Sequence, residues 1–268
     1  MERGGIPACD VPPLSASPRS IVLDAVGSTN TEAFAYAAAG DPGPLWVVAK
    51  RQTGGKGRSG RSWASEPGNL YASLMQRFRC PPTVLNQLSL LSGLAAHDAI
   101  AAVAPRGTLR GLRLKWPNDV LIGDAKCVGI LSESQQAPGE VIVVMGIGIN
   151  IATHPQNIGR PTTSLHAEGV TTTPEAVHAA LADRAAHWIG VWREGANFDA
   201  LRQAWLSRAG AIGEPMSVNT GTERVEGTYM GLDGTGALLL RDRLGRVRVI
   251  TFGDVSLGLG NGTTGGPA

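Results

Sequence analysis

The sequence predicts an α+β protein in two parts, a larger part of strands and helices followed by a small β-rich part. The apolar runs at 45–50 (LWVVAK) and 141–150 (VIVVMGIGIN) are typical of buried strands. Residues 84–104 carry leucine and alanine at helical spacing. From Met216 onward, short alternating strands are separated by glycine turns over about 40 residues, which indicates a small barrel.

The larger part alternates between the two kinds of element. Strands are expected at 20–26, 45–50, 69–78 and 141–150, with three shorter ones joined by turns within 112–134. Helices are expected at 28–40, 84–104, 171–195 and 197–209. Ser28, Thr29 or Asn30 is placed to cap the first helix, and the third has a proline near its start. The histidines and tryptophans of these helices, such as Trp188 and Trp192, are expected to be structural.

Composition excludes several classes of protein. The chain has 268 residues, of which 43% are hydrophobic and 17% charged, and its net charge of +2 does not indicate nucleic-acid binding by itself. Three scattered cysteines, Cys9, Cys80 and Cys127, form neither a disulfide framework nor a metal motif. The N-terminal residues lack the apolar region of a signal peptide, and the longest apolar run is about half a membrane span. A cytoplasmic protein without a membrane segment is expected.

The most unusual stretch is 51–63, RQTGGKGRSGRSW. Gly55, Gly57 and Gly60 spell G-x-G-x-x-G, but the loop leads into a strand, whereas a dinucleotide-binding loop must open a helix. It is either a solvated basic hairpin tip or an anion clamp. In a clamp, glycines let backbone N–H groups approach the ligand and arginines supply forked donors. Trp63 could then stack on a flat ring.

Three other stretches carry candidate residues. Residues 115–119, KWPND, place a cation, an indole and two polar side chains around a rigid turn, although Pro-Asn-Asp also suits a plain turn. Lys126 stands at the mouth of an apolar strand, where a lysine is usually a solvated strand end. Asn150 closes a core strand, where a polar residue is usually a turn former.

Together, GSTN, QTGGKGRSGRSW, KWPND, AKCVGIL and GIGIN resemble the biotin protein ligases in order and spacing, from about Val26 to Asn150. The resemblance implies a mixed β-sheet backed by helices, related to class II aminoacyl-tRNA synthetases, and a small SH3-like barrel. The implied organisation is a flexible leader at 1–19, a catalytic domain at 20–209, the SH3-like domain at 215–257 and a disordered tail at 258–268.

The implied activity is that of a biotin–[biotin carboxyl-carrier protein] ligase. ATP and biotin would form biotinyl-5′-AMP, and a lysine of the carrier domain of acetyl-CoA carboxylase or a related carboxylase would accept the biotin. Mg²⁺ is expected on the ATP phosphates, held mostly by phosphate oxygens and water rather than by protein side chains. A homodimer is compatible with the resemblance.

The resemblance also implies roles for individual residues. Biotin would be bound by Ser28, Thr29, Asn30, Gln52, Lys56, Gly57, Arg58 and Lys126. ATP and the adenylate would be bound by Arg58, Arg61, Trp63, Lys115, Asn118 and Asn150. The catalytic residues would be Lys126, Arg58 and Asp119, with Lys126 reaching the biotin carboxylate and then the adenylate phosphate. Asp119 would orient the incoming carrier lysine.

Two departures and two alternatives accompany this interpretation. Lys56 stands where the family loop usually has arginine, and lysine cannot make a forked pair. Only about 27 residues precede GSTN, too few for the winged helix-turn-helix of some members, so no specific DNA binding is expected.

One alternative is a lipoate-type acyl-adenylating ligase. The other is a nucleic-acid-binding module using the C-terminal arginines, disfavoured by the few aromatic residues among them.

Overall fold

The computed structural model describes residues 18–258. The predicted leader and tail therefore lie outside the described residues, apart from their inner ends. Arg19, at the end of the predicted leader, already begins a strand. Gly258, at the start of the predicted tail, still donates its N–H to the Pro215 carbonyl at 2.8 Å.

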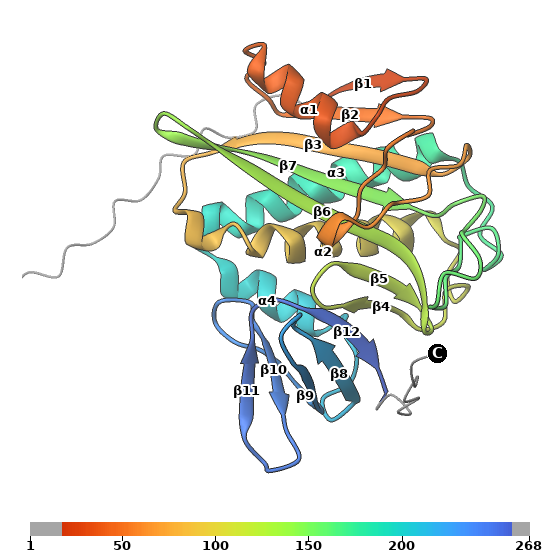
Figure 1. Ribbon diagram of the computed structural model, residues 1–268. Helices are drawn as coiled ribbons and strands as arrows, with labels where there is room; N and C mark the ends of the chain where they lie inside the picture. Colours follow the sequence, from red (N-terminus) through yellow and green to blue (C-terminus); the bar gives the residue numbers. More distant parts are fainter. Residues whose placement is uncertain (1–17, 259–268) are drawn as a thin grey trace, which may run out of the picture.

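A seven-stranded mixed sheet forms the main part of the molecule (Figure 1). Its strands are β1 (Arg19–Leu23), β2 (Leu45–Ala49), β3 (Leu70–Phe78), β4 (Leu112–Lys115), β5 (Asp119–Ile122), β6 (Ala125–Ala137) and β7 (Glu140–Ile149). The order across the sheet is β1-β2-β3-β7-β6-β5-β4, and β1 and β2 pair in parallel whereas the other neighbours are antiparallel. The long β6–β7 hairpin thus lies in the centre.

Helices cover both faces of this sheet, and the alternation of side chains along the strands explains how. On β2, Leu45 and Val47 pack with α1 (Thr29–Ala38) in one cluster, whereas Trp46 belongs to the larger cluster on the opposite face. That opposite face is covered by α2 (Gln87–Val103) and α3 (Pro174–Trp192), and α4 (Phe198–Leu206) packs against these two helices. The α1 face is only partly covered, which leaves room for a site.

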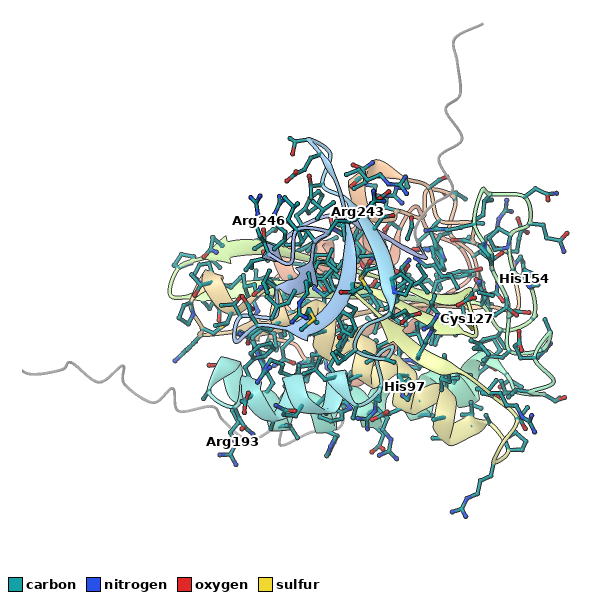
Figure 2. The ribbon with its side chains drawn as sticks, turned by 90° about the horizontal axis from the view of Figure 1, so that it is seen from below. His97, Cys127, His154, Arg193, Arg243 and Arg246 are labelled. Atoms are coloured by element: carbon teal, nitrogen blue, oxygen red, sulfur yellow. The ribbon has the colours of Figure 1, made fainter. Side chains whose placement is uncertain are left out.

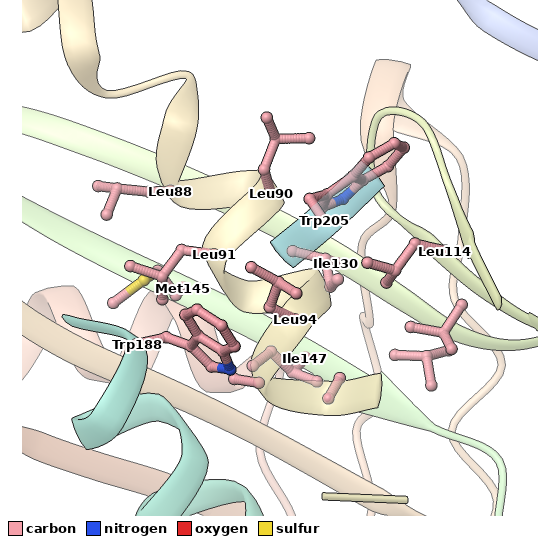
Figure 3. Close-up of a cluster of buried hydrophobic side chains, with 14 of the residues drawn as sticks. Leu88, Leu90, Leu91, Leu94, Leu114, Ile130, Met145, Ile147, Trp188 and Trp205 are labelled. Atoms are coloured by element: carbon pink, nitrogen blue, oxygen red, sulfur yellow. The ribbon is translucent and has the colours of Figure 1, made fainter. Parts of the chain in front are cut away.

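The larger cluster is built from leucines of α2 and tryptophans of the later helices (Figure 3). Leu88, Leu91 and Leu94 are at most 1% exposed and lie against the strands. Trp188 and Trp192 of α3 are 7% and 0% exposed, so their predicted place in the core is confirmed. The side chain of Thr173 accepts the N–H of Ala176 at 3.3 Å and caps α3, and a proline follows it.

The C-terminal part is a five-stranded antiparallel sheet with the order β11-β10-β9-β8-β12. Its strands are β8 (Pro215–Asn219), β9 (Arg224–Leu232), β10 (Leu238–Arg241), β11 (Val247–Ile250) and β12 (Asp254–Leu257). The α+β class, with a mixed sheet backed by helices and a small all-β part, is confirmed. Trp116 joins the two parts by donating its indole N–H to the Gly236 carbonyl at 3.1 Å.

The basic hairpin of the C-terminal sheet is partly neutralised within the molecule. Arg243 and Arg246 lie in the turn between β10 and β11 (Figure 2). Arg243 forms an ion pair with Glu226, and Arg248 lies 2.6 Å from Glu223. Pairs of this kind reduce the positive potential that a nucleic-acid-binding face would need.

Some predicted boundaries were wrong. The first strand ends at Leu23 instead of residue 26, and Val26 keeps only an isolated bridge to Gln52. The second helix begins at Gln87, because residues 82–84 form a separate 3₁₀ turn with proline at its start. None of the helices within residues 18–258 is long and apolar enough to cross a membrane.

Candidate active site

The floor of the site is the open end of the α1 face of the sheet. Along β3 and β7, Met75 pairs with Val144, then Ser73 with Gly146, then Tyr71 with Gly148. Helix α1 covers the apolar pair of Met75 and Val144. Beyond it the row changes to Ser73 and Tyr71 on β3 and to glycines on β7, so this part of the sheet carries hydroxyl groups and its β7 positions have no side chains.

Glycines on neighbouring strands create the space in this floor. Gly129 of β6 pairs with Gly148 of β7, and the indole of Trp63 lies directly on both. A Cβ at Gly129 would stand 2.5 Å from the indole, and one at Gly148 would stand 2.6 Å from it. Gly146 likewise leaves room for the amide of Asn30. Glycine at alternate positions of an apolar strand is a sequence signal of such close approach.

A wall of hydrogen-bonding side chains rises beside this floor, at the N-terminus of α1. The backbone N–H and the hydroxyl of Thr29 donate to Gln52 Oε1 at 2.9 and 3.1 Å. The Ser73 hydroxyl lies 2.7 Å from the Thr29 hydroxyl and 2.6 Å from Asn30 Oδ1. Ser28 occupies the N-cap position but its side chain does not cap the helix. The buried Ser28 side chain lines the pocket and forms no capping hydrogen bond with the helix.

The charged centre of the site is a triad of two lysines and one carboxylate, in which Lys126 and Asp119 are buried and Lys115 is half-buried. Lys126 forms an ion pair with Asp119, and Lys115 Nζ lies 3.4 Å from the second carboxylate oxygen. Burial raises the pKa of Asp119, but attraction to Lys126 and Lys115 outweighs it and holds that pKa below its ordinary value. Burial lowers the pKa of Lys126, and the charge of Arg160 lowers it further, against the opposing effect of Asp119. Two ammonium groups share one carboxylate, so the triad keeps a net positive charge that an entering anion can meet.

The fold fixes Lys126 through its backbone. Its N–H donates to the Pro161 carbonyl at 3.0 Å, and its carbonyl accepts the Thr163 N–H at 3.0 Å. Its ammonium stands 5.5 Å from the centre of the Trp63 ring. Asp119 lies opposite Gly129 in the β5–β6 pairing, which places its carboxylate beside the glycine floor. The lysine is buried, and the ordinary interpretation of a solvated strand end is wrong.

The glycine loop closes over the floor between β2 and β3. A Cβ at Gly55 would stand 2.7 Å from the Trp63 carbonyl, so only glycine fits there. Lys56 has an exposed side chain, and its backbone bridges to Ser62. Arg58 reaches the C-terminal part, donating to the Gly253 carbonyl at 3.2 Å, with its guanidinium 5.0 Å from the centre of the Phe252 ring.

The remaining predicted residues divide into lining and supporting roles. Asn118 donates to the Ile130 carbonyl at 2.7 Å and accepts from Arg58 at 3.4 Å, so it braces that arginine. Asn150 is buried and donates to the Thr163 carbonyl at 3.0 Å. Cys127, next to Lys126, is a buried thiol whose pKa burial raises to about 12, as suits the predicted structural role.

Two hollows meet at the indole of Trp63. The first is lined by the polar wall, the glycine floor, Arg58, Arg61 and Asn118. The second is lined by Ser62, Trp63, Ala64, Lys126, Asn150, Pro155, Ile158, Arg160 and Thr162. Lys126, Trp63 and Arg160 belong to both. Lys115 lies instead in a third cleft, between the main sheet and the C-terminal part.

Several lining residues escaped the sequence analysis. Arg160 and Asp254 come from segments without a motif, and Tyr71 looks like an ordinary member of a core strand. The same is true of Ser73, which does not line the hollow but hydrogen-bonds to Thr29 and Asn30 of the wall. The glycines Gly129, Gly146 and Gly148 carried a usable signal, since they alternate with apolar residues within buried strands.

Comparison with known proteins agrees with this geometry. The biotin/lipoate A/B protein ligase family model matches residues 23–150, and the biotin protein ligase C-terminal domain model matches 211–258. The biotin–[acetyl-CoA-carboxylase] ligase of Paracoccus denitrificans is 37% identical over 88% of this chain and 100% of that protein. The Mycobacterium tuberculosis ligase of the same name is 35% identical over 87% of each.

A solved structure extends the likeness to three dimensions. The biotin protein ligase from Aquifex aeolicus in complex with biotin and ATP has a TM-score of 0.74 and 27% sequence identity to this chain. The match covers 90% of this chain and 98% of that one. From these matches over both parts of the molecule, the chain belongs to the biotin protein ligase family.

Proposed function

We propose that this chain is an ATP-dependent ligase that activates biotin as biotinyl-5′-AMP and transfers it to a lysine of a biotin carboxyl carrier protein. Relatives at 37% and 35% identity are biotin–[acetyl-CoA-carboxylase] ligases. The observation that carries the proposal is the position of Lys126, which lines both hollows beside Trp63. A cation at that junction serves a reaction between two anions, one from each hollow.

The first hollow suits the ureido ring of biotin. Its wall offers the Ser28 and Thr29 hydroxyls and the amides of Asn30 and Gln52, groups that can donate to and accept from a cyclic urea. At Gly146 and Gly148 the floor holds the Asn30 amide and the Trp63 indole close to the sheet, and these groups can contact a flat ring system and its aliphatic tail. The tail then leads the carboxylate toward Lys126.

The second hollow suits the adenylate. It combines the Trp63 indole with the Asn150 side chain and the aliphatic Ile158, a set that fits a flat, polar-edged base. With both substrates bound, the biotin carboxylate and the α-phosphate approach each other at Lys126. The cation weakens their repulsion and gains strength as charge shifts in the transition state.

Transfer needs an entry for the carrier lysine. The third cleft, between the main sheet and the C-terminal part, reaches Asp119 and Lys126 and is free of the biotin wall. In this proposal the carrier lysine enters there, and Asp119 orients its amine toward the acyl carbon. Attack forms the amide bond, and the bond from the acyl carbon to the phosphate oxygen breaks, releasing AMP.

Mg²⁺ belongs to the proposal as a companion of ATP. Within residues 18–258, no group of three His, Cys, Asp or Glu side chains is arranged to hold a metal ion. The central carboxylate, Asp119, is already held by two ammonium groups. This donor set fits an ion that arrives on the phosphates and keeps water ligands. A cytoplasmic location is also part of the proposal, since ATP is the energy source.

One assay tests the function. The protein is incubated with ATP, Mg²⁺, labelled biotin and a biotin carboxyl carrier domain, and label on the carrier lysine is measured. The expected result is ATP-dependent labelling that a carrier lysine-to-arginine variant abolishes. A parallel reaction with labelled lipoate and a lipoyl domain addresses the lipoate-type alternative. Preferential labelling of the lipoyl domain would replace biotin by lipoate as the substrate.

A further inference from the structure

Arg160 lies where the three hollows of the site meet. Its side chain lines the first hollow, the second hollow and the cleft between the main sheet and the C-terminal part. The next residue, Pro161, accepts the Lys126 N–H at 3.0 Å, and Thr163 donates to the Lys126 carbonyl at 3.0 Å. These two bonds hold Arg160 beside the strand that carries Lys126.

The guanidinium of Arg160 has unused donors. Among the described residues 18–258 it forms neither an ion pair nor a hydrogen bond, in contrast to the cations around it. Lys126 and Lys115 share Asp119, and Arg61 pairs with Asp254. An arginine presents five N–H donors in a planar fork that matches phosphate oxygens. The charge of Arg160 acts on Asp119, but that carboxylate is already paired with Lys126, so the N–H donors of Arg160 are left for an anionic ligand.

The charge of the site supports a ligand with several negative charges. Five cationic and two anionic side chains line the hollow that contains Lys126, which leaves a net charge of +3. Four of these cations are Lys126, Arg58, Arg61 and Arg160. Biotin carboxylate carries one negative charge, and ATP with one Mg²⁺ carries about two. The excess positive charge therefore matches both substrates together, and it falls short without Arg160.

The direction of the reaction assigns Arg160 to one end of ATP. When the biotin oxygen attacks the α-phosphorus, the bond to the bridging oxygen breaks on the opposite side, and pyrophosphate leaves with the electron pair. The polar wall that suits biotin lies on one side of Lys126. The cleft shares Lys126 with this hollow and is lined by none of the wall residues. Its cations are Arg61, Lys115, Lys126 and Arg160, and Asp119, Asp124, Glu214 and Asp254 also line it. Of these cations, Arg160 forms no ion pair within the described part of the chain that would compete with a phosphate.

We propose that Arg160 binds the β- and γ-phosphates of ATP and stabilises pyrophosphate as it leaves through the cleft. This inference rests on the proposed function. It assigns a third arginine to the nucleotide, from the segment that follows β7, in addition to the two of the glycine loop. It gives Arg160 no contact with biotin and none with the acyl carbon.

The test uses Arg160→Gln and Arg160→Lys in the full-length protein, with Arg106→Gln as the control. Arg106 is an exposed arginine in the loop after α2, away from the three hollows. Four quantities are measured: the KM for ATP, the rate of pyrophosphate release, inhibition by added pyrophosphate, and single-turnover transfer from synthetic biotinyl-AMP. The last reaction contains no pyrophosphate and reports on folding and on the carrier step.

For Arg160→Gln we expect about a tenfold higher KM for ATP and about tenfold weaker inhibition by pyrophosphate, with transfer within twofold of wild type. Arg160→Lys should recover part of both losses, since it restores the charge but not the fork. Unchanged pyrophosphate inhibition in the Gln variant would overturn the proposal. So would an equal loss in transfer, because Arg160 would then act on the adenylate or the carrier. A wild-type protein that releases no pyrophosphate with biotin would contradict the proposed function instead.

Discussion

Arg61 of the glycine loop forms an ion pair with Asp254 of the C-terminal sheet, 193 residues away in the chain. Arg58 strengthens the same link through its hydrogen bond to Gly253. The two arginines that the proposed function assigns to ATP are thus both held by the C-terminal part. A nucleotide entering the site must compete with Asp254 for Arg61.

Removing that competitor should strengthen ATP binding. In Asp254→Ala we expect the KM for ATP to fall about two- to threefold, because Arg61 no longer has to leave a carboxylate. Stability should change by less than about 1 kcal/mol, since both partners are roughly half exposed. The measurement is the KM for ATP in pyrophosphate release, with Asp24→Ala, from the exposed pair with Lys50, as the control. A rise in KM would show that the pair organises the loop for ATP.

Loss of the central cation should affect adenylate formation most. Lys126→Met keeps the stem and removes the charge, so we expect pyrophosphate release to slow about 10²–10³-fold. Biotin affinity should fall much less, because the buried ring supplies part of it. Transfer from pre-made biotinyl-AMP should also suffer less, since the two anions are already joined.

Lys115→Met is the matched control for that variant, because it removes the other ammonium beside Asp119. It should slow pyrophosphate release by less than about tenfold, because Lys115 lines the cleft through which pyrophosphate is proposed to leave but neither of the hollows where the two anions meet. Pyrophosphate release near the wild-type rate in Lys126→Met would remove this lysine from the centre of the mechanism.

The glycine floor should tolerate no side chain. In Gly129→Ala the new methyl group would overlap the Trp63 indole and push it off the sheet. We expect biotin affinity, measured by calorimetry, to fall at least about tenfold. Gly234→Ala is the control, since a Cβ there would meet no atom within 4 Å. Equal affinities in the two variants would mean that the indole can move without consequence.

The sequence motifs predicted which residues form this site, but not how those residues are arranged in space. Asp119 and Lys126 flank a turn, so their closeness follows from local structure. The Arg61–Asp254 pair depends on how two separate sheets pack, and no local pattern encodes that. Arg160 is a similar case, because its position comes from backbone bonds to the Lys126 strand. The strand pattern after Met216 predicted the small C-terminal β part, whereas the resemblance supplied the mixed sheet, which hydrophobic patterns alone would not have specified.

A half-buried carboxylate outside the site should govern stability in acid. Asp98 of α2 accepts from Arg208 Nε at 2.8 Å and from the Trp188 indole at 3.1 Å, and thereby joins three helical segments. Burial raises its pKa, but hydrogen bonds from His97 and Arg208 outweigh burial and hold the pKa below its ordinary value. The pKa of Asp98 is lower in the folded protein than in the unfolded chain, where it is about 4, so the ionised carboxylate stabilises the fold above about pH 4. This stabilisation is lost as the pH falls through the pKa of the folded state.

Asp98→Asn removes that charge with little change of shape. We expect it to lower the free energy of unfolding by about 1–2 kcal/mol at pH 7. The gap between wild type and variant should narrow below about pH 4, where the wild-type carboxylate becomes protonated. Urea unfolding at pH 7 and at pH 3, with Asp199→Asn from an exposed pair as the control, measures both. If the gap were equally large at both pH values, the shape of the side chain rather than its charge would hold the helices together.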